Sequence, residues 1–288
     1  MLLAIIIAEY LLNLKMGFIT LVESVIMVIV VLKAISMNRS NKVFYHVYIP
    51  PDLRAWSWQY VIDEQLSCIR RSRLHVSSRI MMFVTMPLYW PDAGFLPFKR
   101  DGDSADILFK DKVWEYVSSR YPFVEIVDMR DCQQPNLYEA STLSAIKQLT
   151  TPSDCVLYIH NKGIVSNSTH TTAWRQVLNH FMIERWTLCM SMLNRHDVVG
   201  VRDKPTAISG NTITSGNFWW TTGEYINTLP DPLDVTSYSL FKPDNHDVRY
   251  AYERWILSSL NANVGYVYDT TIDHSLDYLF LENIKEKI

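Results

Sequence analysis

From residue 43 onward, short apolar runs alternate with longer stretches in which apolar residues recur every three or four positions. The short runs are rich in β-branched and aromatic residues, as strands are, and the longer stretches have the spacing of helices that bury one face. Strands separated by helices pair in parallel through right-handed crossovers. The pattern therefore predicts an α/β fold, a layered sandwich with a mostly parallel central sheet. The expected strands are residues 43–49, 79–85, 123–127 and 155–159, and the expected helices are residues 58–69, 106–118, 137–149 and 248–260.

The strand expected at residues 155–159 is the most informative element. It is apolar throughout, it lies between Pro152 and Gly163, and it ends at a polar tip formed by His160, Asn161 and Lys162. In an open α/β sheet, ligands bind outside the carboxyl ends of the strands. This polar tip is therefore the first candidate for a binding site.

Residues 1–36 have a different pattern, because two long apolar runs follow one another there. The second run, residues 17–35, is close to the ~20 residues that a helix needs to cross a bilayer. No small-residue cleavage site follows it, so we expect a hydrophobic helical segment at 1–36 that acts as an uncleaved single-pass membrane anchor, and a folded domain at 37–288. An acid within the run, Glu23, is costly in lipid, which leaves an interfacial hairpin or a poorly ordered upstream extension as the alternatives.

The orientation of this anchor follows from the positive charges around it. Lys33, Arg39 and Lys42 lie at or beyond the end of the run, which weakly favours a cytosolic position for the rest of the chain. Translation from Met37 would instead give a soluble protein.

Composition and charge exclude some classes of protein. The chain has 288 residues, of which 48% are hydrophobic and 20% charged, the balance of a folded protein with a substantial core. The net charge of −3 and the pI near 6.2 give no electrostatic case for binding nucleic acid. The four cysteines show neither a CxxC pair nor the spacing of a disulfide framework.

Several short motifs occur in a definite order along residues 43–275. They read VFYHVY at 43–48, DEQL at 63–66, YE at 138–139, YIHNKG at 158–163, WR at 174–175, IERW at 183–186, DVVG at 197–200, SGNFWW at 215–220, and RY with a later E and WI at 249–256. This ordered set resembles a group of small GT-A-type glycosyltransferases of bacteria and large algal viruses, one of which acts in capsid glycosylation. An ordered set is far more specific than any single motif.

The resemblance implies a GT-A-like domain with hexosyltransferase activity. The enzyme would move a hexose or deoxyhexose from a nucleotide-diphosphate sugar, most often UDP-linked, to a glycan acceptor on a viral or cell-surface glycoprotein or polysaccharide. A catalytically inactive, membrane-tethered glycan-binding or scaffold protein of the same fold is the alternative. A nucleotidyltransferase is a second rival, but it would need a glycine-rich phosphate loop near the first strand, and residues 46–51 contain no glycine.

The resemblance places the donor at the first strand and at the polar tip. Lys162 would stabilise the leaving diphosphate as a fixed cation, and His160 would bind phosphate or metal. The other interpretation is a turn that His160 and Asn161 stabilise and Gly163 closes. The residues expected to bind the donor are His46, Tyr48, His160, Asn161, Lys162 and Gly163.

A divalent cation, Mn²⁺ or Mg²⁺, is the cofactor that the resemblance implies, because GT-A enzymes hold one with an Asp-x-Asp motif after the central strand. Here His160, Asn161 and Lys162 stand at that point, so His160 is the one candidate ligand. The literal Asp101-Gly-Asp103 lies in a polar loop with no strand leading into it, and Asp-Gly is first of all a turn signal.

The SGNFWW motif is the expected acceptor site. A glycine permits close approach of the backbone, an asparagine offers donors and an acceptor, and aromatic rings give flat faces that suit sugars. Core packing of the rings is the alternative, since alternate side chains of a strand point inward. The residues concerned are Gly216, Asn217, Phe218, Trp219 and Trp220.

Glu253 is the expected catalytic base, on a helix with tryptophan beside it. Proton removal from the acceptor hydroxyl requires a carboxylate, and a base fits an inverting displacement better than a retaining one. An exposed glutamate paired with Arg249 is the alternative, and Asp244 and Asp247 are the reserve candidates. Glu64 and Glu139 also lie in the matching motifs, but amphipathic helices explain them almost as well.

Overall fold

The computed structural model of the chain describes residues 40–49, 57–87, 104–132, 139–164, 168–202, 214–234, 248–259 and 261–269. Contacts between Cα atoms divide the chain into two units, Met1–Ser40 and Asn41–Ile288. All the elements below belong to the second unit.

The expected membrane anchor requires a correction. Within the described ranges, no helix has both the length and the apolar character needed to cross a bilayer. Residues 1–36, to which the anchor was assigned, lie outside those ranges. The membrane-associated localisation and its cytosolic bias are withdrawn on this finding.

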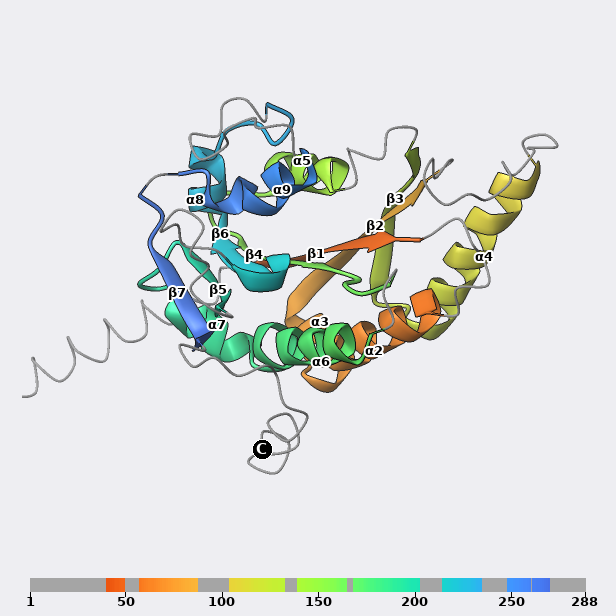
Figure 1. Ribbon diagram of the computed structural model, residues 1–288, viewed down its shortest axis with the longest axis horizontal. Coiled ribbons are helices and arrows are strands. Elements are labelled where there is room, and N and C mark those ends of the chain that lie inside the picture. Colours follow the sequence, from red (N-terminus) through yellow and green to blue (C-terminus); the bar gives the residue numbers. More distant parts are fainter. Residues whose placement is uncertain are drawn as a thin grey trace, which may run out of the picture. The chain divides into compact units, whose positions relative to one another are not determined.

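A seven-stranded sheet organises the second unit, with the strand order β3-β2-β1-β4-β6-β5-β7 (Figure 1). β1 pairs in parallel with β2 and β4, β2 with β3, and β5 with β7, whereas β6 runs antiparallel to both β4 and β5. The prediction of a mixed α/β fold with a mostly parallel sheet is confirmed, but β5, β7 and the antiparallel β6 were not among the expected strands. The strands are β1 Asn41–Tyr48, β2 Ser78–Pro87, β3 Val124–Cys132, β4 Cys155–His160, β5 Val198–Arg202, β6 Trp219–Thr222 and β7 Val264–Asp269.

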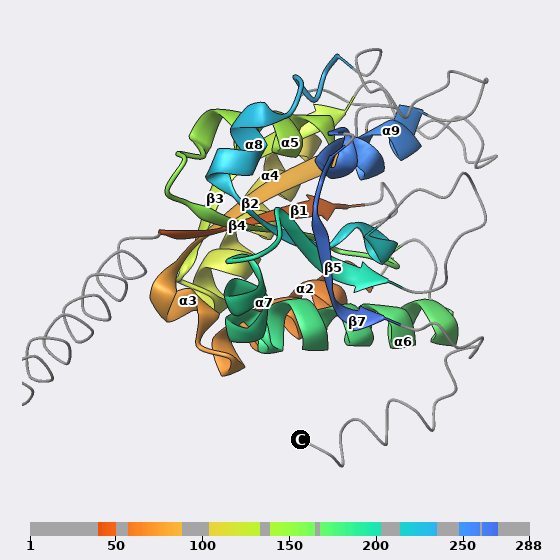
Figure 2. The ribbon, with the colours of Figure 1, turned by 90° about the vertical axis from the view of Figure 1, so that its left-hand side faces the viewer.

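Helices cover both faces of this sheet, and Figure 2 shows the two layers above and below the strands. One layer contains α5, α8 and α9 together with η5, and the other contains α2, α3, α6, η2 and α7, with α4 beside α2. A short 3₁₀ turn, η3, precedes β6. The bounds are α2 Ser57–Arg71, α3 Leu74–Ser77, α4 Ser104–Arg120, α5 Ala140–Leu149, α6 Thr169–Leu178, η2 Asn179–Glu184, α7 Trp186–Met192, η3 Ser215–Asn217, α8 Gly223–Thr228, α9 Val248–Arg254 and η5 Trp255–Leu257.

Alternation along the central strands divides the core into two parts. In β1, Val43, Tyr45 and Val47 pack on the α2 side, while Phe44 packs on the α5 side. β4 alternates in the same way, as period-two side-chain geometry requires. Both strands are almost entirely buried, which explains why they read as continuous apolar runs and not as alternating ones.

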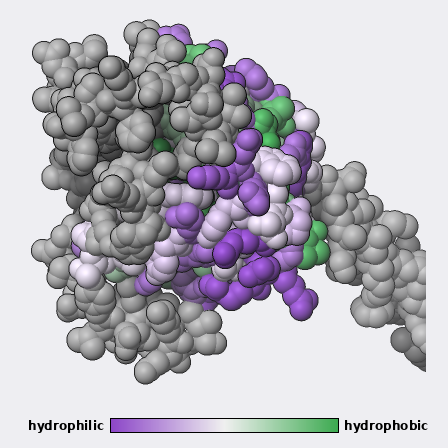
Figure 3. Space-filling model, turned by 90° about the vertical axis from the view of Figure 1, so that its right-hand side faces the viewer, coloured by the Kyte–Doolittle hydropathy of each residue, from purple (hydrophilic) through white to green (hydrophobic). Residues whose placement is uncertain are grey.

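The spacing of apolar residues at 58–69 and 106–118 predicts one buried face for each helix. Val61, Ile62 and Leu66 form that face of α2. On α4, Val113 is buried but Trp114 is 58% exposed, because a neighbouring helical position points about 100° away. Figure 3 shows the face of the molecule at the β3 and α4 end of the sheet, where the coloured surface is mostly hydrophilic.

The strand order contains a topological switch point. The chain passes from β1 to β2 and then to β3 on one side, and β4 lies on the other side of β1. Since β1 and β4 are parallel, their carboxyl ends meet at the same edge of the sheet. This is the place where open α/β sheets bind ligands.

Candidate functional site

The six expected donor residues come together at this switch point. Tyr48 ends β1, His160 ends β4, and His46 lies directly opposite His160 in the parallel register. Asn161, Lys162 and Gly163 continue from β4 as the polar tip.

Asn161 joins the ends of the two strands. Its side-chain amide donates to the Tyr48 carbonyl at 2.7 Å, and its Oδ1 accepts from the Tyr48 amide at 2.9 Å. Its own backbone amide donates to the His46 carbonyl at 3.2 Å. Asn161 is only 2% exposed, so it extends the β1–β4 pairing with its side chain and leaves little of itself for a ligand.

The tip closes as a tight turn, which is the alternative that the sequence analysis gave for these residues. The Lys162 amide donates to the His160 carbonyl at 2.8 Å, and Gly163 has a φ of +85°. A Cβ atom at Gly163 would lie 2.5 Å from Cγ2 of Thr171 on α6. Only glycine therefore fits this position without strain.

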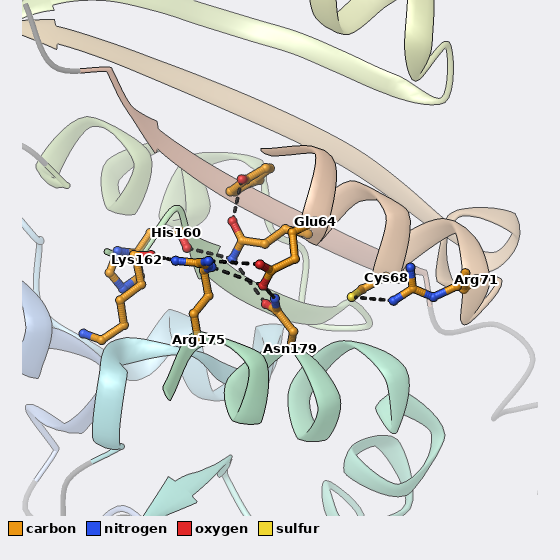
Figure 4. Close-up of polar contacts among 9 residues, drawn as sticks. Glu64, Cys68, Arg71, His160, Lys162, Arg175 and Asn179 are labelled. Atoms are coloured by element: carbon orange, nitrogen blue, oxygen red, sulfur yellow. Dashed lines mark hydrogen bonds and ion pairs between the residues drawn. The ribbon is translucent and has the colours of Figure 1, made fainter. Parts of the chain in front are cut away.

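A buried ion pair supports the tip from the α2 and α6 side (Figure 4). Arg175 on α6 is 2% exposed and donates from Nε and Nη2 to both carboxylate oxygens of Glu64 on α2, at 3.1 and 2.9 Å. Its third nitrogen, Nη1, donates to the Lys162 carbonyl at 3.1 Å. This fork geometry is specific to arginine and ties the turn to two helices at once.

Neighbouring amides complete the same network. Gln65 donates to the His160 carbonyl at 2.9 Å and accepts from the Tyr45 hydroxyl at 2.5 Å. Asn179 donates to Glu64 at 2.7 Å, and it is the first residue of the π-helix η2, a kind of element frequent at functional sites. Figure 4 shows that the Lys162 side chain extends away from this cluster. The network therefore fixes the Lys162 backbone without using the Lys162 ammonium group.

The sequence alone gives little sign of this network. Glu64 and Arg175 both lie in the matching motifs, but they are 111 residues apart in the chain, so no local pattern could pair them. The one local sign of this network is Arg175 itself, a charged residue beside Trp174 and Val177 on the apolar face of its helix.

On the opposite face of the sheet, His46 is almost completely enclosed. Its Nδ1 lies 2.8 Å from the Thr142 hydroxyl on α5, and its Nε2 has no hydrogen-bond partner among the described residues. Burial lowers the pKa of His46 to about 3, so the ring is neutral at pH 7. A neutral imidazole can act there only through hydrogen bonds.

His160 lies beside His46 on the same face. Its Nε2 is 3.0 Å from the Gly216 carbonyl, and its ring meets the Phe218 ring edge-on at 5.3 Å between centroids. The His160 ring also stacks beside Tyr158, with 6.3 Å between centroids. These contacts join the expected donor and acceptor motifs at one residue.

The aromatic part of the SGNFWW motif does not form an open sugar platform. Phe218, Trp219 and Trp220 are at most 1% exposed. Trp219 stacks on Tyr158 at 5.1 Å, and the Trp220 indole donates to the Met182 carbonyl at 2.8 Å. The expectation of stacking on an acceptor is corrected accordingly: the rings pack in both cores because this strand lies inside the sheet.

Gly216 and Asn217 form a sharp turn in front of these rings. Asn217 is 4% exposed, and its amide donates to the Glu139 carboxylate at 2.7 Å. Its Oδ1 accepts from the Trp219 indole at 3.1 Å. Its side chain is therefore committed to internal bonds, which corrects its expected role in acceptor binding.

Glu253, the expected base, lies on α9 and is partly buried. Burial raises the pKa of Tyr158 well above its usual value, and Glu139 and Glu253 add to that shift. The helix that carries Glu253 packs in the same core cluster as Tyr158 of β4. The Arg249 side chain and Asp244, Asp247, Asp101 and Asp103 lie outside the described residues.

The described residues do not fit a divalent cation. Among them, no three His, Cys, Asp or Glu side chains are grouped so that they could hold a metal ion. The Nε2 of His160 is already bonded to the Gly216 carbonyl. The expected Mn²⁺ or Mg²⁺ remains a prediction without support from neighbouring ligands.

One family model matches part of the chain. Residues 124–264, from β3 into β7, match the model of a family described as a domain of unknown function (DUF8361). No curated protein sequence matches the chain. A crystal structure of 4-diphosphocytidyl-2C-methyl-D-erythritol synthase is similar over 87% of this chain and 98% of that chain, with 13% identity and a TM-score of 0.36. At that level the likeness adds nothing to the fold already described.

Proposed function

We propose that the chain is a GT-A-like glycosyltransferase that moves a hexose or deoxyhexose from a nucleotide-diphosphate sugar, UDP-linked in the first instance, to a glycan acceptor. The observation that carries the proposal is the meeting of the six expected donor residues at the β1–β4 switch point. Residues from two motifs more than 100 positions apart are paired there, as the 113-residue separation of Tyr48 and Asn161 shows. A ligand at such an edge contacts both strands.

Lys162 supplies the charge that the leaving diphosphate needs. In this proposal its ammonium group neutralises the phosphates, while the Arg175 bond to its carbonyl keeps the backbone in place. No step is assigned to a metal ion, and the expected divalent cation enters only as a variable of the test.

His46 and Tyr48 form the nucleoside side of the proposed donor site. The neutral His46 ring is as enclosed as Asn161, at 2% exposure, so in this proposal it shapes the nucleoside side from within the sheet and Tyr48, at the end of β1, contacts the nucleoside.

Glu253 is the proposed base for the acceptor hydroxyl. It is carried by α9, which packs on the same side of the sheet as His46 and His160, in the core cluster that contains Tyr158. Removal of the hydroxyl proton by Glu253 favours an inverting displacement at the sugar carbon. The proposal places no sugar ring against the three buried aromatic residues.

An inactive glycan-binding or scaffold protein of the same fold is the second candidate. One observation favours it: the backbone and amide groups of the tip are bonded within the protein, and none of the residues at 160–163 is acidic. Such a protein would bind glycans without turning over a nucleotide sugar.

Calorimetric titration of the full chain with a panel of UDP-, GDP- and dTDP-sugars, with and without Mn²⁺, tests the proposal. We expect binding of one donor, weakened about tenfold or more in Lys162→Ala because a charge-assisted contact is lost. Lys112→Ala, an exposed position on α4, is the matched control. Slow donor hydrolysis by the parent and its loss in Glu253→Gln would place the base. Failure of every donor to bind would contradict the proposal and favour the glycan-binding candidate.

A further inference from the structure

Two consecutive left-handed residues shape the turn before β6. Gly216 has a φ of +80° and Asn217 a φ of +54°. For a residue with a side chain this conformation costs about 1 to 2 kcal/mol, so the surroundings must hold it. A Cβ atom at Gly216 would lie 2.6 Å from Leu178 and 2.9 Å from Trp174, so α6 packs against the turn.

Glu139 holds the second of these residues. It immediately precedes α5, it is 6% exposed, and its Oε2 accepts from the Asn217 amide at 2.7 Å. The other end of the Asn217 side chain accepts from the Trp219 indole at 3.1 Å. With both ends of its amide bonded to buried groups, Asn217 cannot rotate without breaking a buried hydrogen bond.

The direction of the Gly216 carbonyl follows from this turn, and that carbonyl decides the state of His160. A carbonyl oxygen only accepts hydrogen bonds, so the contact of 3.0 Å requires His160 to donate from Nε2. A neutral His160 therefore carries its proton on Nε2 and accepts at Nδ1. Any role of the neutral ring as a base or a metal ligand then belongs to Nδ1.

The start of α5 serves both histidines. Glu139 reaches the turn that binds His160, and Thr142, three residues later, contacts His46 at 2.8 Å. Residues three apart lie on the same helical face, here the one that faces the sheet. The two histidines are direct partners in the β1–β4 register.

We propose that Glu139 is a positioning residue: through Asn217 and the Gly216 carbonyl, it holds the His160 ring with its proton on Nε2 and so orients that ring for the donor. The donor part of this statement rests on the proposed function. The tautomer part does not, because it concerns the protein alone.

Nitrogen NMR of the full chain labelled at histidine nitrogens tests the tautomer without any ligand, and a His160→Gln variant assigns the signals. We expect the Nε2–H form of His160 in the parent. Glu139→Ala, which removes the acceptor, and Asn217→Gly, which tolerates the positive φ but removes the amide, should each shift the ring towards a mixture of tautomers. Glu139→Gln keeps an acceptor oxygen and should preserve the parent signals. Glu224→Gln, an exposed acid on α8, is the matched control.

Donor titration of the same variants gives the functional readout. We expect about tenfold weaker binding in Glu139→Ala and Asn217→Gly, the size of one lost hydrogen bond, with rescue in Glu139→Gln. Folded variants with parent-like His160 signals would overturn the proposal, and so would a Glu139→Gln variant that behaves like Glu139→Ala. Absence of donor binding by the parent, with the tautomer shift intact, would overturn the proposed function but not the positioning of His160.

Discussion

His46 and His160 lie side by side on neighbouring strands, yet their surroundings give them different states. His46 is 2% exposed and bonds to a hydroxyl that can donate or accept, so either tautomer fits. His160 is partly exposed and bonds to a carbonyl, which admits only a donor. Residue type alone therefore did not determine the chemistry at either position; the bonded partner did.

The buried state of His46 predicts a pH dependence of stability. The pKa of His46 falls from 6.5 to about 3 in the folded protein, so below about pH 6.5 the unfolded chain binds a proton that the folded chain does not. This contribution to stability is present above pH 6.5 and is lost as the pH falls towards 3. We expect the free energy of unfolding to decrease by up to about 1.4 kcal/mol per pH unit from this group alone.

Urea unfolding of the parent and of His46→Asn, at about pH 7.5, 6.5 and 5.5, isolates this effect. The stability difference between the two proteins should shrink as the pH falls, because the variant lacks the titrating ring. His170→Asn is the control, since His170 is exposed on α6. A difference that stays constant with pH would show that folding does not lower the pKa of His46.

At the scale of elements, the tip after β4 is held by two helices and by the turn before β6. Gln65 and Arg175 bind its carbonyls from α2 and α6, and the Gly216 carbonyl, in a turn that packs against α6, accepts from His160. Loops that carry functional side chains are often rigid where the scaffold fixes their backbone. This double support explains how a short turn keeps one geometry.

Loss of the buried ion pair should weaken both stability and the tip. In Glu64→Gln, the Arg175 guanidinium stays buried without its counter-charge, and we expect a loss of about 2 to 4 kcal/mol in the free energy of unfolding. The loss is below the full value for a buried pair because the Glu64 side chain is 16% exposed. Denaturant unfolding at pH 7 measures it.

Glu125→Gln provides the comparison for this variant. It breaks the Arg79–Glu125 pair between β2 and β3, whose side chains are 51% and 48% exposed. An exposed pair contributes less than about 1 kcal/mol, so this variant should change stability little. Equal effects of the two substitutions would contradict the buried role of the Glu64–Arg175 pair.

At the scale of the molecule, the second unit contains every described element of the sheet and of the candidate site. It begins at Asn41, which is also the first residue of β1. Among the described residues, the core clusters on both faces of the sheet belong to this unit. We therefore expect the unit to fold without the residues before it.

A chain that starts at Met37 tests this expectation. Its urea midpoint and the slope of its transition should equal those of the full chain, because the buried contacts of the sheet are unchanged. Circular dichroism and fluorescence should report the same transition. A lower midpoint would show that residues 1–36 stabilise the second unit.

The sequence by itself determined the order and type of the main elements. The periods of two and 3.6 are local properties, so the runs at 43–49 and 155–159 and the helix at 58–69 could be predicted, as could a polar tip at His160. Parallel pairing then brought the two strand ends together. The antiparallel β6 escaped prediction because its four residues are too short to show a period.

Only the tertiary structure decided which polar groups form the site and which rings stay in the core. Glu64 meets Arg175 across 111 residues, and Glu139 meets Asn217 across 78, so neither pair leaves a local pattern. From its sequence, the SGNFWW motif suits a sugar platform and core packing equally well. The structure buries its three rings within the sheet, between two helical layers. Burial and long-range pairing depend on the whole packed chain, whereas periodicity depends only on near neighbours.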